Sequence, residues 1–266
     1  MKKILSFYRN YHSYILLSAK GSLKGQIQDS KLSWMLWIID PIFQTFLYGV
    51  FIAVLRGKSD SNFGVFVLIG ITHWNFFNKT VKNAITAVKK NRVLLHNFKI
   101  PISTIILIPA LTSIFQYAIS SGLLIIMMFI FQVKISFYIL FFPLYLALFL
   151  ILTFSISLIM MHIGVYFSDI KILISMFFKI LFFASGIIFP LDQIIGRMNL
   201  PDFFRYIFLY ANPITFFITE MRKVLMYSEP PDYLISLLWV IAIILLTFFA
   251  VKLTSRYGKD YGKFVK

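Results

Sequence analysis

Residues 137–161, FYILFFPLYLALFLILTFSISLIMM, contain no charged side chain. About 20 consecutive apolar residues are enough for a helix to cross the hydrocarbon core of a bilayer, so this stretch predicts a transmembrane helix. The whole chain has the same character, since 59% of its 266 residues are hydrophobic, only 14% are charged and the mean hydropathy is +0.84. Soluble domains are typically about 45–50% apolar and about 25% charged. The composition therefore predicts an all-α integral membrane protein.

Five other apolar stretches accompany this one and give six expected spans. They are Trp34–Leu55, Phe63–Phe77, Ile102–Phe131, Phe137–Met161, Ile172–Phe189 and Tyr233–Val251. The second is short and is expected to extend through polar residues as far as Ala87. The third is long, so it must tilt or bend, and Pro109 or the patch Ser120–Gly122 offers a place for the bend.

The basic residues predict how these spans are oriented. Residues 1–33 hold six Lys and Arg, residues 78–101 hold six and the tail after Val251 holds five, whereas residues 56–62 hold two. Because Lys and Arg concentrate in cytoplasmic loops, both termini and the 78–101 segment are expected on the cytoplasmic side. The net charge of +16 does not indicate a nucleic-acid partner, since the basic clusters alternate with apolar runs and form no single patch.

We expect one transmembrane domain over residues 1–266. Its predicted parts are a cytoplasmic interfacial helix (1–33), spans one to five (34–189) with a cytoplasmic coupling segment (78–101), outer gate helices (190–232), span six (233–253) and a cytoplasmic tail (254–266). The first part lacks the length of apolar sequence needed for a span. Its apolar residues recur at helical spacing, which favours a helix in the headgroup plane over a loose basic tail.

Motifs for chemistry are missing from the sequence. There is no cysteine, and the four histidines have no metal-ligand spacing, so we expect neither a metal site nor a catalytic site. The segment 57–59 matches only the end of a phosphate-binding loop, with Ile52 where the first glycine belongs. The chain is therefore expected to hold no cofactor and to take its energy from an ion gradient or a separate subunit.

Four blocks of the sequence resemble the membrane subunits of ATP-binding-cassette exporters of cell-surface polysaccharides. The blocks are LSWMLWIIDPIFQTFLYGVF (32–51), GITHWNFFNKTVKNAITAVKKNRVLLHNFKIP (70–101), YFSDIKILISMFFKILFFASGIIFP (166–190) and LYANPITFFITEMRKVLM (209–226). The matching positions include Leu32, Trp37, Pro41, Gly70, Trp74, Asn91, Pro101, Asp169, Ser185, Pro190, Asn212, Pro213 and Arg222. The chain departs from the family pattern at Ser33, Ile100 and Ser168, where the family usually has Gly, an aromatic residue and Arg.

The resemblance implies a homodimer of six-span subunits bound to two copies of a separate ATPase, which carries the ATP and Mg. It further implies export of a lipid-linked glycan, such as O-antigen, capsular polysaccharide or teichoic acid, across the cytoplasmic (inner) membrane of a bacterium. This chain is then a transport subunit and not an enzyme. Two alternatives are the permease of an ATP-driven drug or lipid exporter and a membrane-embedded glycan-modifying enzyme.

A basic stretch, KNRVLLHNFKIP (90–101), is the candidate contact for the ATPase. Its apolar anchors and flanking cations are Arg92, Val93, Leu94, Leu95, Phe98 and Lys99. Cations alone suffice to hold a loop against anionic lipid, at about 1 kcal/mol each. The added apolar residues at helical spacing favour a helix that docks on the ATPase, although a lipid-facing amphipathic helix has the same pattern.

Two ionisable residues fall inside the expected spans. A charge at the centre of a span costs about 2.5–3.5 kcal/mol on insertion scales, so Asp40 and Lys179 are expected to face the translocation path near its inner mouth. There they can pair, and Lys179 can attract a pyrophosphate. In the alternative, Lys179 snorkels to the interface and Asp40 caps a helix that begins at Pro41.

Aromatic residues are expected along the path and at its outer end. Sugars stack on aromatic faces, and the resemblance implies that span one lies along the path. Trp34, Trp37 and Phe43 are therefore expected to line it, with anchoring in the interfacial aromatic belt as the alternative for Trp34. Residues 190–232 are too polar for a span, and Pro201 and Pro213 suit two helix starts. As the resemblance implies, we expect a pair of short re-entrant helices there that dip into the outer leaflet and form an outer gate, although helices resting on the membrane surface are the alternative. The expected gate residues are Phe203, Phe204, Phe208, Asn212, Pro213, Phe216 and Phe217.

Overall fold

The computed structural model describes residues 2–29, 33–56, 62–91, 93, 102–167, 169–197, 201, 203 and 206–258. Within these ranges every regular element is a helix or a helical turn. In chain order they are α1 (Lys2–Asp29), α2 (Ser33–Arg56), α3 (Phe63–Lys90), α5 (Ile102–Ile130), the 3₁₀ turn η1 (Phe137–Phe141), α6 (Phe142–Tyr166), α7 (Ile170–Ala184), α8 (Leu191–Arg197), the π turn η2 (Ile207–Ala211), α10 (Pro213–Arg222), the π turn η3 (Lys223–Tyr227) and α11 (Tyr233–Tyr257).

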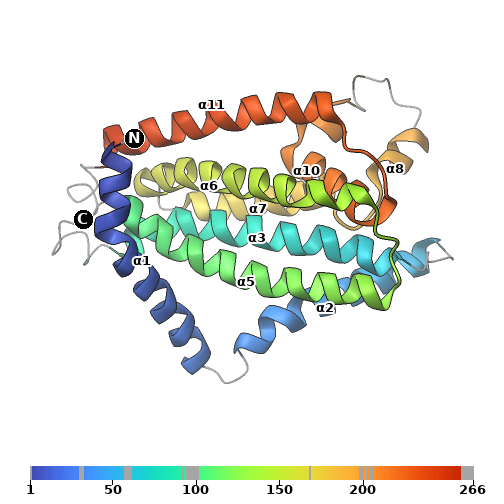
Figure 1. Ribbon diagram of the computed structural model, residues 1–266, viewed down its shortest axis with the longest axis horizontal. Helices are drawn as coiled ribbons and strands as arrows, with labels where there is room; N and C mark the ends of the chain where they lie inside the picture. Colours follow the sequence, from blue (N-terminus) through green and yellow to red (C-terminus); the bar gives the residue numbers. More distant parts are fainter. Residues whose placement is uncertain are drawn as a thin grey trace.

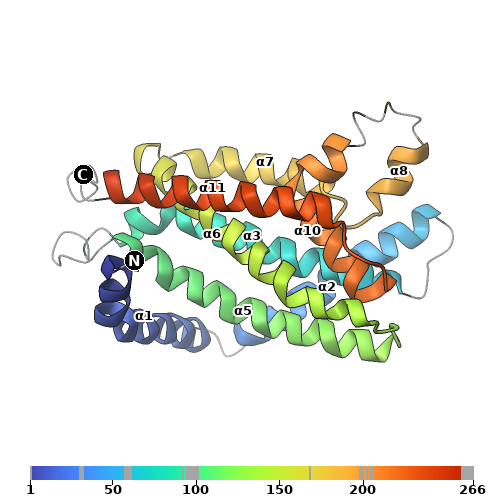
Figure 2. The ribbon, with the colours of Figure 1, turned by 45° about the horizontal axis from the view of Figure 1, so that its top comes forward.

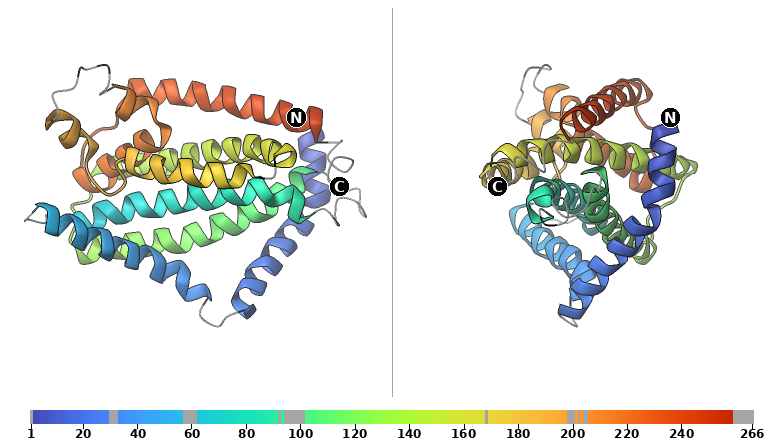
Figure 3. Two further views of the ribbon diagram at one scale, coloured as in Figure 1. Left: turned by 180° about the vertical axis from the view of Figure 1, so that it is seen from behind. Right: turned by 90° about the vertical axis from the view of Figure 1, so that its left-hand side faces the viewer.

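The long helices α3, α5, α6, α7 and α11 lie side by side as a bundle, with α2 inclined against it (Figures 1 and 2). The start of α1 and the end of α11 lie at one end of the bundle, which we call the terminal end. Helix α1 crosses the bundle there instead of running along it (Figure 3). Helices α8 and α10 lie at the opposite end, which we call the far end.

Four of the described helices are long and apolar enough to cross a membrane: α2, α5, η1 with α6, and α11. The two other expected spans differ from prediction. Helix α3 continues to Lys90, past the expected limit at Ala87, and carries many polar residues. Helix α7 has only 15 residues and ends at Ala184, so it is about 22 Å long and shorter than the hydrocarbon core.

Helix α3 forms the centre of the bundle. It packs against α2, α5, α6, α7 and α10, and its buried side chains run from Phe63 to Val88. Residues 78–90, expected to belong to a cytoplasmic coupling segment, are therefore part of this packed helix. The reason is an apolar face in which Ala84 and Val88 join Met161 of α6 and Ile106 of α5 in one cluster.

The side chain of Arg222, at the end of α10, connects three segments of the far end. It is 4% exposed and donates hydrogen bonds to the carbonyl oxygens of Phe66 (3.0 Å), Gly186 (2.8 Å) and Ile187 (2.6 Å). Its guanidinium carbon also lies 3.4 Å from the centroid of the Phe66 ring. A buried charge is costly unless its hydrogen-bonding groups are satisfied, so this arrangement, the Arg222 latch, fixes α10 against α3 and the turn after α7.

Two glycines make room for the latch. A Cβ atom on Gly70 would lie 2.5 Å from the Ile187 carbonyl oxygen and 2.6 Å from Nη2 of Arg222. Gly186, in the turn after α7, has a φ of 60°, a left-handed conformation that residues with a side chain rarely adopt. Both positions let the backbone approach the guanidinium closely.

Helix α11 is fastened to α6 by a row of polar side-chain pairs, which we call the α6–α11 ladder. The pairs are Tyr145 with Ser236 (2.5 Å), Ser155 with Thr247 (2.8 Å) and His162 with Thr254 (3.0 Å). Hydrogen bonds between transmembrane helices contribute about 0.6 kcal/mol each on average. Because the pairs are spread along most of both helices, they fix the register of α11 on α6.

The latch generates a stability prediction. We expect Gly70→Ala to lower the free energy of unfolding by about 1–3 kcal/mol, because the added methyl group pushes against a carbonyl and a guanidinium that cannot both move away. Thermal unfolding of the purified protein in detergent measures this effect. The matched control is Gly64→Ala on the same helix, where the nearest atom, in the Phe131 ring, is 3.8 Å from the new Cβ. Equal melting temperatures for the two variants would contradict the proposed close packing.

Candidate functional site

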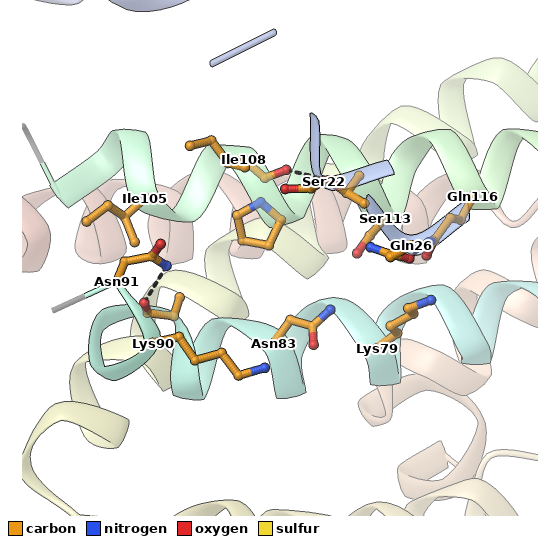
Figure 4. A pocket seen from close by; sticks show the side chains of 13 residues that line it. Ser22, Gln26, Lys79, Asn83, Lys90, Asn91, Ile105, Ile108, Ser113 and Gln116 are labelled. Atoms are coloured by element: carbon orange, nitrogen blue, oxygen red, sulfur yellow. Dashed lines mark hydrogen bonds between the residues drawn. The ribbon is translucent and has the colours of Figure 1, made fainter. Parts of the chain in front are cut away.

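Helix α3 carries a stripe of polar side chains along one face. Its members recur at helical spacing: Thr72, Asn75, Lys79, Asn83 and Lys90. Because residues three or four apart share a helix face, these side chains point in one direction. That direction is toward α5, where Lys79 and Asn83 extend into the space between the two helices (Figure 4).

Helix α5 has a polar face opposite this stripe, formed by Thr112, Ser113, Gln116 and Ser120. Pro109 lies inside this helix. A proline within a helix removes the hydrogen bond to the carbonyl four residues earlier, so Pro109 cannot supply one to Ile105. Ile105 and Pro109 both line the space between the helices, which places an interruption of the α5 backbone beside the polar side chains.

Two adjoining cavities, of about 240 and 230 Å³, lie between these polar faces. The first is nearer the terminal end and is closed on one side by Ser22 and Gln26 of α1. The second is lined by Trp37, Asp40 and Gln44 of α2. The two adjoin at Lys79, Ser113 and Gln116, which line both, and together we call them the α3–α5 groove.

Hydrogen bonds between helices close the groove from outside. The Gln116 amide donates to Oε1 of Gln26 over 2.8 Å and so fixes α1 to α5. The Asn75 amide donates to Oε1 of Gln44 over 3.3 Å and so connects α3 to α2. The bond between Gln26 and Gln116 holds α1 against the protein, so that α1 does not contact lipid alone.

A further hydrogen bond, from α5 to α2, depends on a proline. Pro41 lies inside α2, so the Trp37 carbonyl cannot bond to an N–H four residues later. This carbonyl instead accepts a hydrogen bond from Oγ of Ser120 over 3.0 Å. The same helix shows that the alternative for Asp40 was wrong, because α2 begins at Ser33 and Asp40 does not cap a helix starting at Pro41.

Four buried oxygens along the groove have no hydrogen-bond partner in the described part of the chain: Thr72 Oγ1, Asn78 Oδ1, Gln116 Oε1 and Tyr117 Oη. All four belong to residues that line the second cavity. A buried acceptor without a donor costs about 1–3 kcal/mol. The groove is therefore lined by residues whose hydrogen-bonding capacity is not fully used by the described part of the chain.

The charges in the groove come from Lys79, Lys90 and Asp40. Asp40 attracts Lys79 electrostatically, whereas no ion pair joins it to Lys179, the partner that we expected. The structure thus brings Trp37 and Asp40 together in the groove and places Lys179 elsewhere, on α7.

Lys179 belongs to a second basic site. It is exposed on α7, and both Lys179 and Lys171 repel Lys82 of α3 electrostatically. Lys82 also lies 5.8 Å from the centroid of the Phe178 ring. Lys82 of α3 thus lies near two cations of α7, Lys171 and Lys179, on a surface that is otherwise apolar.

The other expected path residues are arranged differently. Phe43 is 56% exposed on the face of α2 that carries Phe46 and Val50, both exposed as well, so it lies outside the α3–α5 groove. Trp34 belongs to α2, but its side chain lies outside the described part of the structure. Trp37 packs edge-on against Phe115 of α5, with ring centroids 6.5 Å apart.

The expected gate residues divide into two groups. Phe216 and Phe217 of α10 are almost wholly buried, and each ring lies 6.2 Å from that of Trp239 in α11, so they anchor α10 in the core of the subunit. Phe203 and Phe208 are exposed. Phe204 lies outside the described residues, as does most of the sequence that directly follows Pro201.

Asn212 and Pro213 begin α10 as the sequence indicated. Pro213 occupies the first turn, and Oδ1 of Asn212 accepts a hydrogen bond from the Ile214 amide over 3.0 Å. The Asn212 amide donates to Oγ of Ser185 over 2.9 Å. The helix start is therefore fixed to the residue directly after α7, beside the Arg222 latch.

A buried carboxylate joins α10 to α11. Glu220 is 1% exposed and accepts hydrogen bonds from Nζ of Lys223 (2.7 Å) and the amide of Asp232 (2.8 Å). Asp232 in turn caps α11, so Glu220 connects α10 at the far end to the first turn of the last span.

Most of the expected coupling residues lie beyond what the structure describes. Arg92, Leu94, Leu95, Phe98 and Lys99 are outside the described residues. Val93 is 69% exposed at the terminal end. The structure therefore shows an exposed apolar residue at the place where docking was expected and leaves the rest of the segment as a prediction.

Sequence reasoning missed the α3–α5 groove. It assigned the polar patch Ser120–Gly122 of the third span only to a bend. A signal was present in the recurrence of Thr72, Asn75, Lys79 and Asn83 at intervals of three or four residues. Such spacing marks one helix face and would have identified the α3 half of the groove.

Comparison with known proteins places the chain among transporters. Residues 14–226 match the family model described as ABC-2 type transporter. The O-antigen export system permease protein RfbA of Myxococcus xanthus is 21% identical over 222 residues, which cover 84% of each chain. Two proteins of the same name from Klebsiella pneumoniae are 24% identical over 233 residues, 87% of each chain.

The groove predicts a pattern of water access that single cysteines can report, because the chain contains no cysteine. We expect Asn83→Cys to react with a charged, membrane-impermeant maleimide in inside-out vesicles, since the reactive thiolate forms only where water reaches it. Two controls should stay unlabelled: Thr80→Cys, which is buried on the same helix, and Leu245→Cys, which is 64% exposed on the apolar surface of α11. Labelling of Leu245→Cys as fast as Asn83→Cys would contradict an aqueous groove.

Proposed function

Because this chain belongs to the family of ABC-2 type transporters, we propose that it is the membrane subunit of an ATP-driven exporter of polysaccharide. The observation that carries the proposal is the similarity to O-antigen export permeases over more than four fifths of the chain. These relatives are named as permease proteins, so the chain is a transport component and not an enzyme. In this proposal ATP and Mg are bound by two copies of a separate ATPase subunit.

The proposed topology has six crossings, formed by α2, α3, α5, α6, α7 and α11. Helix α3 is about 42 Å long, and its polar stripe faces α5 instead of lipid, which makes a crossing physically acceptable. Helix α7 is short, and the segment around α8 and α10 would complete its passage while staying buried in protein, as non-helical backbone in a membrane requires. The basic terminal end is then cytoplasmic, and α1 lies at that interface of the bacterial inner membrane.

A homodimer is supported by the outer surface of α2 and α7. These helices adjoin, since the rings of Tyr48 and Phe182 are 5.5 Å apart, and both carry exposed apolar side chains such as Phe46 and Met176. Lys179 lies in the same region. Lipid covers the apolar residues equally well, but a cation facing lipid at this depth is costly, and a second copy of the chain would provide a polar path for Lys179. In that path Lys179 would attract the phosphate of a lipid-linked glycan.

The exported polymer is proposed to be a lipid-linked O-antigen, capsular polysaccharide or teichoic acid. A strain without this protein is expected to lose the polymer from its surface and to accumulate the lipid-linked form inside, because assembly continues while export stops. Immunoblotting of surface polysaccharide, with the gene restored on a plasmid as control, measures this. Unchanged surface polysaccharide with new drug sensitivity would instead favour the alternative of a drug exporter.

Coupling to the ATPase is proposed to use the segment that follows α3 in the sequence. We expect Leu94→Asp with Leu95→Asp to abolish co-purification of the ATPase, because two carboxylates would have to be buried in the docking groove. Ile135→Asp, at an exposed apolar position in the far-end turn, is the matched control and should leave the complex intact. Normal co-purification and ATPase activity with the double variant would point to lipid anchoring as the role of this segment.

A further inference from the structure

We propose that the α3–α5 groove binds the headgroup of an inner-leaflet lipid that carries both phosphate and hydroxyl groups. This inference depends on the proposed function only for the identity of the lipid. The groove lies within one subunit, between α1, α2, α3 and α5, and is separate from the basic site around Lys179 on α7.

The part of the groove near the terminal end has the chemistry of a phosphate site. Lys79, Asn83 and Lys90 of α3 line it together with Asn91, and none of the described residues that line this cavity is acidic. The ammonium groups attract an anion, and the amide N–H groups can donate hydrogen bonds to it. A hydrogen bond from a cation to phosphate is about twice as strong as one between neutral groups. Lys90 and Asn91 lie at the terminal end, whereas Lys79 lies about 16 Å deeper along α3, so a headgroup that contacts all of them must extend along the groove.

The deeper part has the chemistry of a hydroxyl site. Its unpaired acceptors, on Thr72, Asn78 and Gln116, require donors, and alcohols supply them. The rings of Trp37 and Tyr117 line the same cavity and offer faces on which the C–H groups of a sugar or glycerol can stack. Phosphate donors at one end and hydroxyl acceptors at the other match a phosphate ester of a polyol.

The groove has room for a group much larger than one water molecule. A single water molecule needs only about 10–15 Å³ of cavity volume, whereas the two cavities have about 240 and 230 Å³. Helix α1 forms one wall through the bond between Gln26 and Gln116. Because α1 crosses the terminal end, a lipid can place its headgroup beneath this helix while its chains remain in the inner leaflet.

The first test compares two lysines of α3 in the purified full chain. Binding of phosphatidylglycerol, and of N-acetylglucosamine linked to a polyprenyl diphosphate, is titrated by native mass spectrometry. Lys79→Gln is expected to weaken binding of the recognised probe about tenfold, the size of one charge-assisted hydrogen bond. Lys89→Gln, which removes an exposed cation that does not line the groove, is expected to leave affinity unchanged. If Lys79→Gln does not fold, Lys90→Gln replaces it.

The second test isolates the hydroxyl site. Thr72→Val and Thr80→Val each remove a buried, unpaired hydroxyl from α3 with little change of shape, but only Thr72 lines the groove. Thr72→Val is expected to weaken binding of the hydroxyl-bearing probe several-fold. It should not affect binding of phosphatidic acid, which has the phosphate but no free alcohol hydroxyl group. Thr80→Val should bind both as the unmodified chain does.

The probes distinguish two sources of the same chemistry. Selective binding of the polyprenyl diphosphate sugar identifies the transported lipid, whereas selective binding of phosphatidylglycerol identifies a resident membrane lipid, and either supports the site. No saturable binding, or equal loss of affinity in Lys79→Gln and Lys89→Gln, would overturn the inference. Neither result bears on whether polysaccharide is exported, because that is measured on the cell surface.

Discussion

A single buried guanidinium organises the far end of this molecule. Arg222 has no carboxylate to neutralise it in the described structure; it is satisfied by backbone carbonyls from α3 and from the turn after α7. Such a charge is tolerated only while all these acceptors stay in place. The planar fork of Arg can reach several carbonyls at once, which the single ammonium of Lys cannot. The latch therefore holds α3, α7 and α10 in one arrangement.

The latch matters for the groove because both depend on α3. Fixing the far end of α3 at Phe66 and Gly70 sets the rotation of the helix, and this rotation directs its polar stripe toward α5. A helix with this stripe in lipid would expose amides and a lysine to hydrocarbon, at a high cost. Placed at the bundle centre, the same residues line a space that admits a polar molecule. The polar stripe that makes α3 a poor isolated span thus allows it to line the α3–α5 groove inside the bundle.

Much of the fold could be predicted from the sequence, because long apolar runs leave few alternatives. Helices α2, α5, α6 and α11 follow from composition alone, and the cap formed by Asn212 and Pro213 follows from local chemistry. The partners of Arg222 could not be predicted, since they are backbone carbonyls that any sequence supplies. The partner of Asp40 was missed for a related reason: depth along two helices suggested Lys179, but depth does not determine which faces meet. The groove required the relative rotation of α3 and α5, which only packing provides.

The α6–α11 ladder has a mechanical consequence. Three polar links along two adjacent helices oppose both sliding and rotation, so α6 and α11 form a stiff beam. The described contacts of α7 with α2 and α3 are instead made by aromatic rings, such as Phe182 against Tyr48 and Trp74, and rings can shift past one another without breaking hydrogen bonds. The contact between α6 and α11 therefore resists deformation more strongly than the contacts of α7 do.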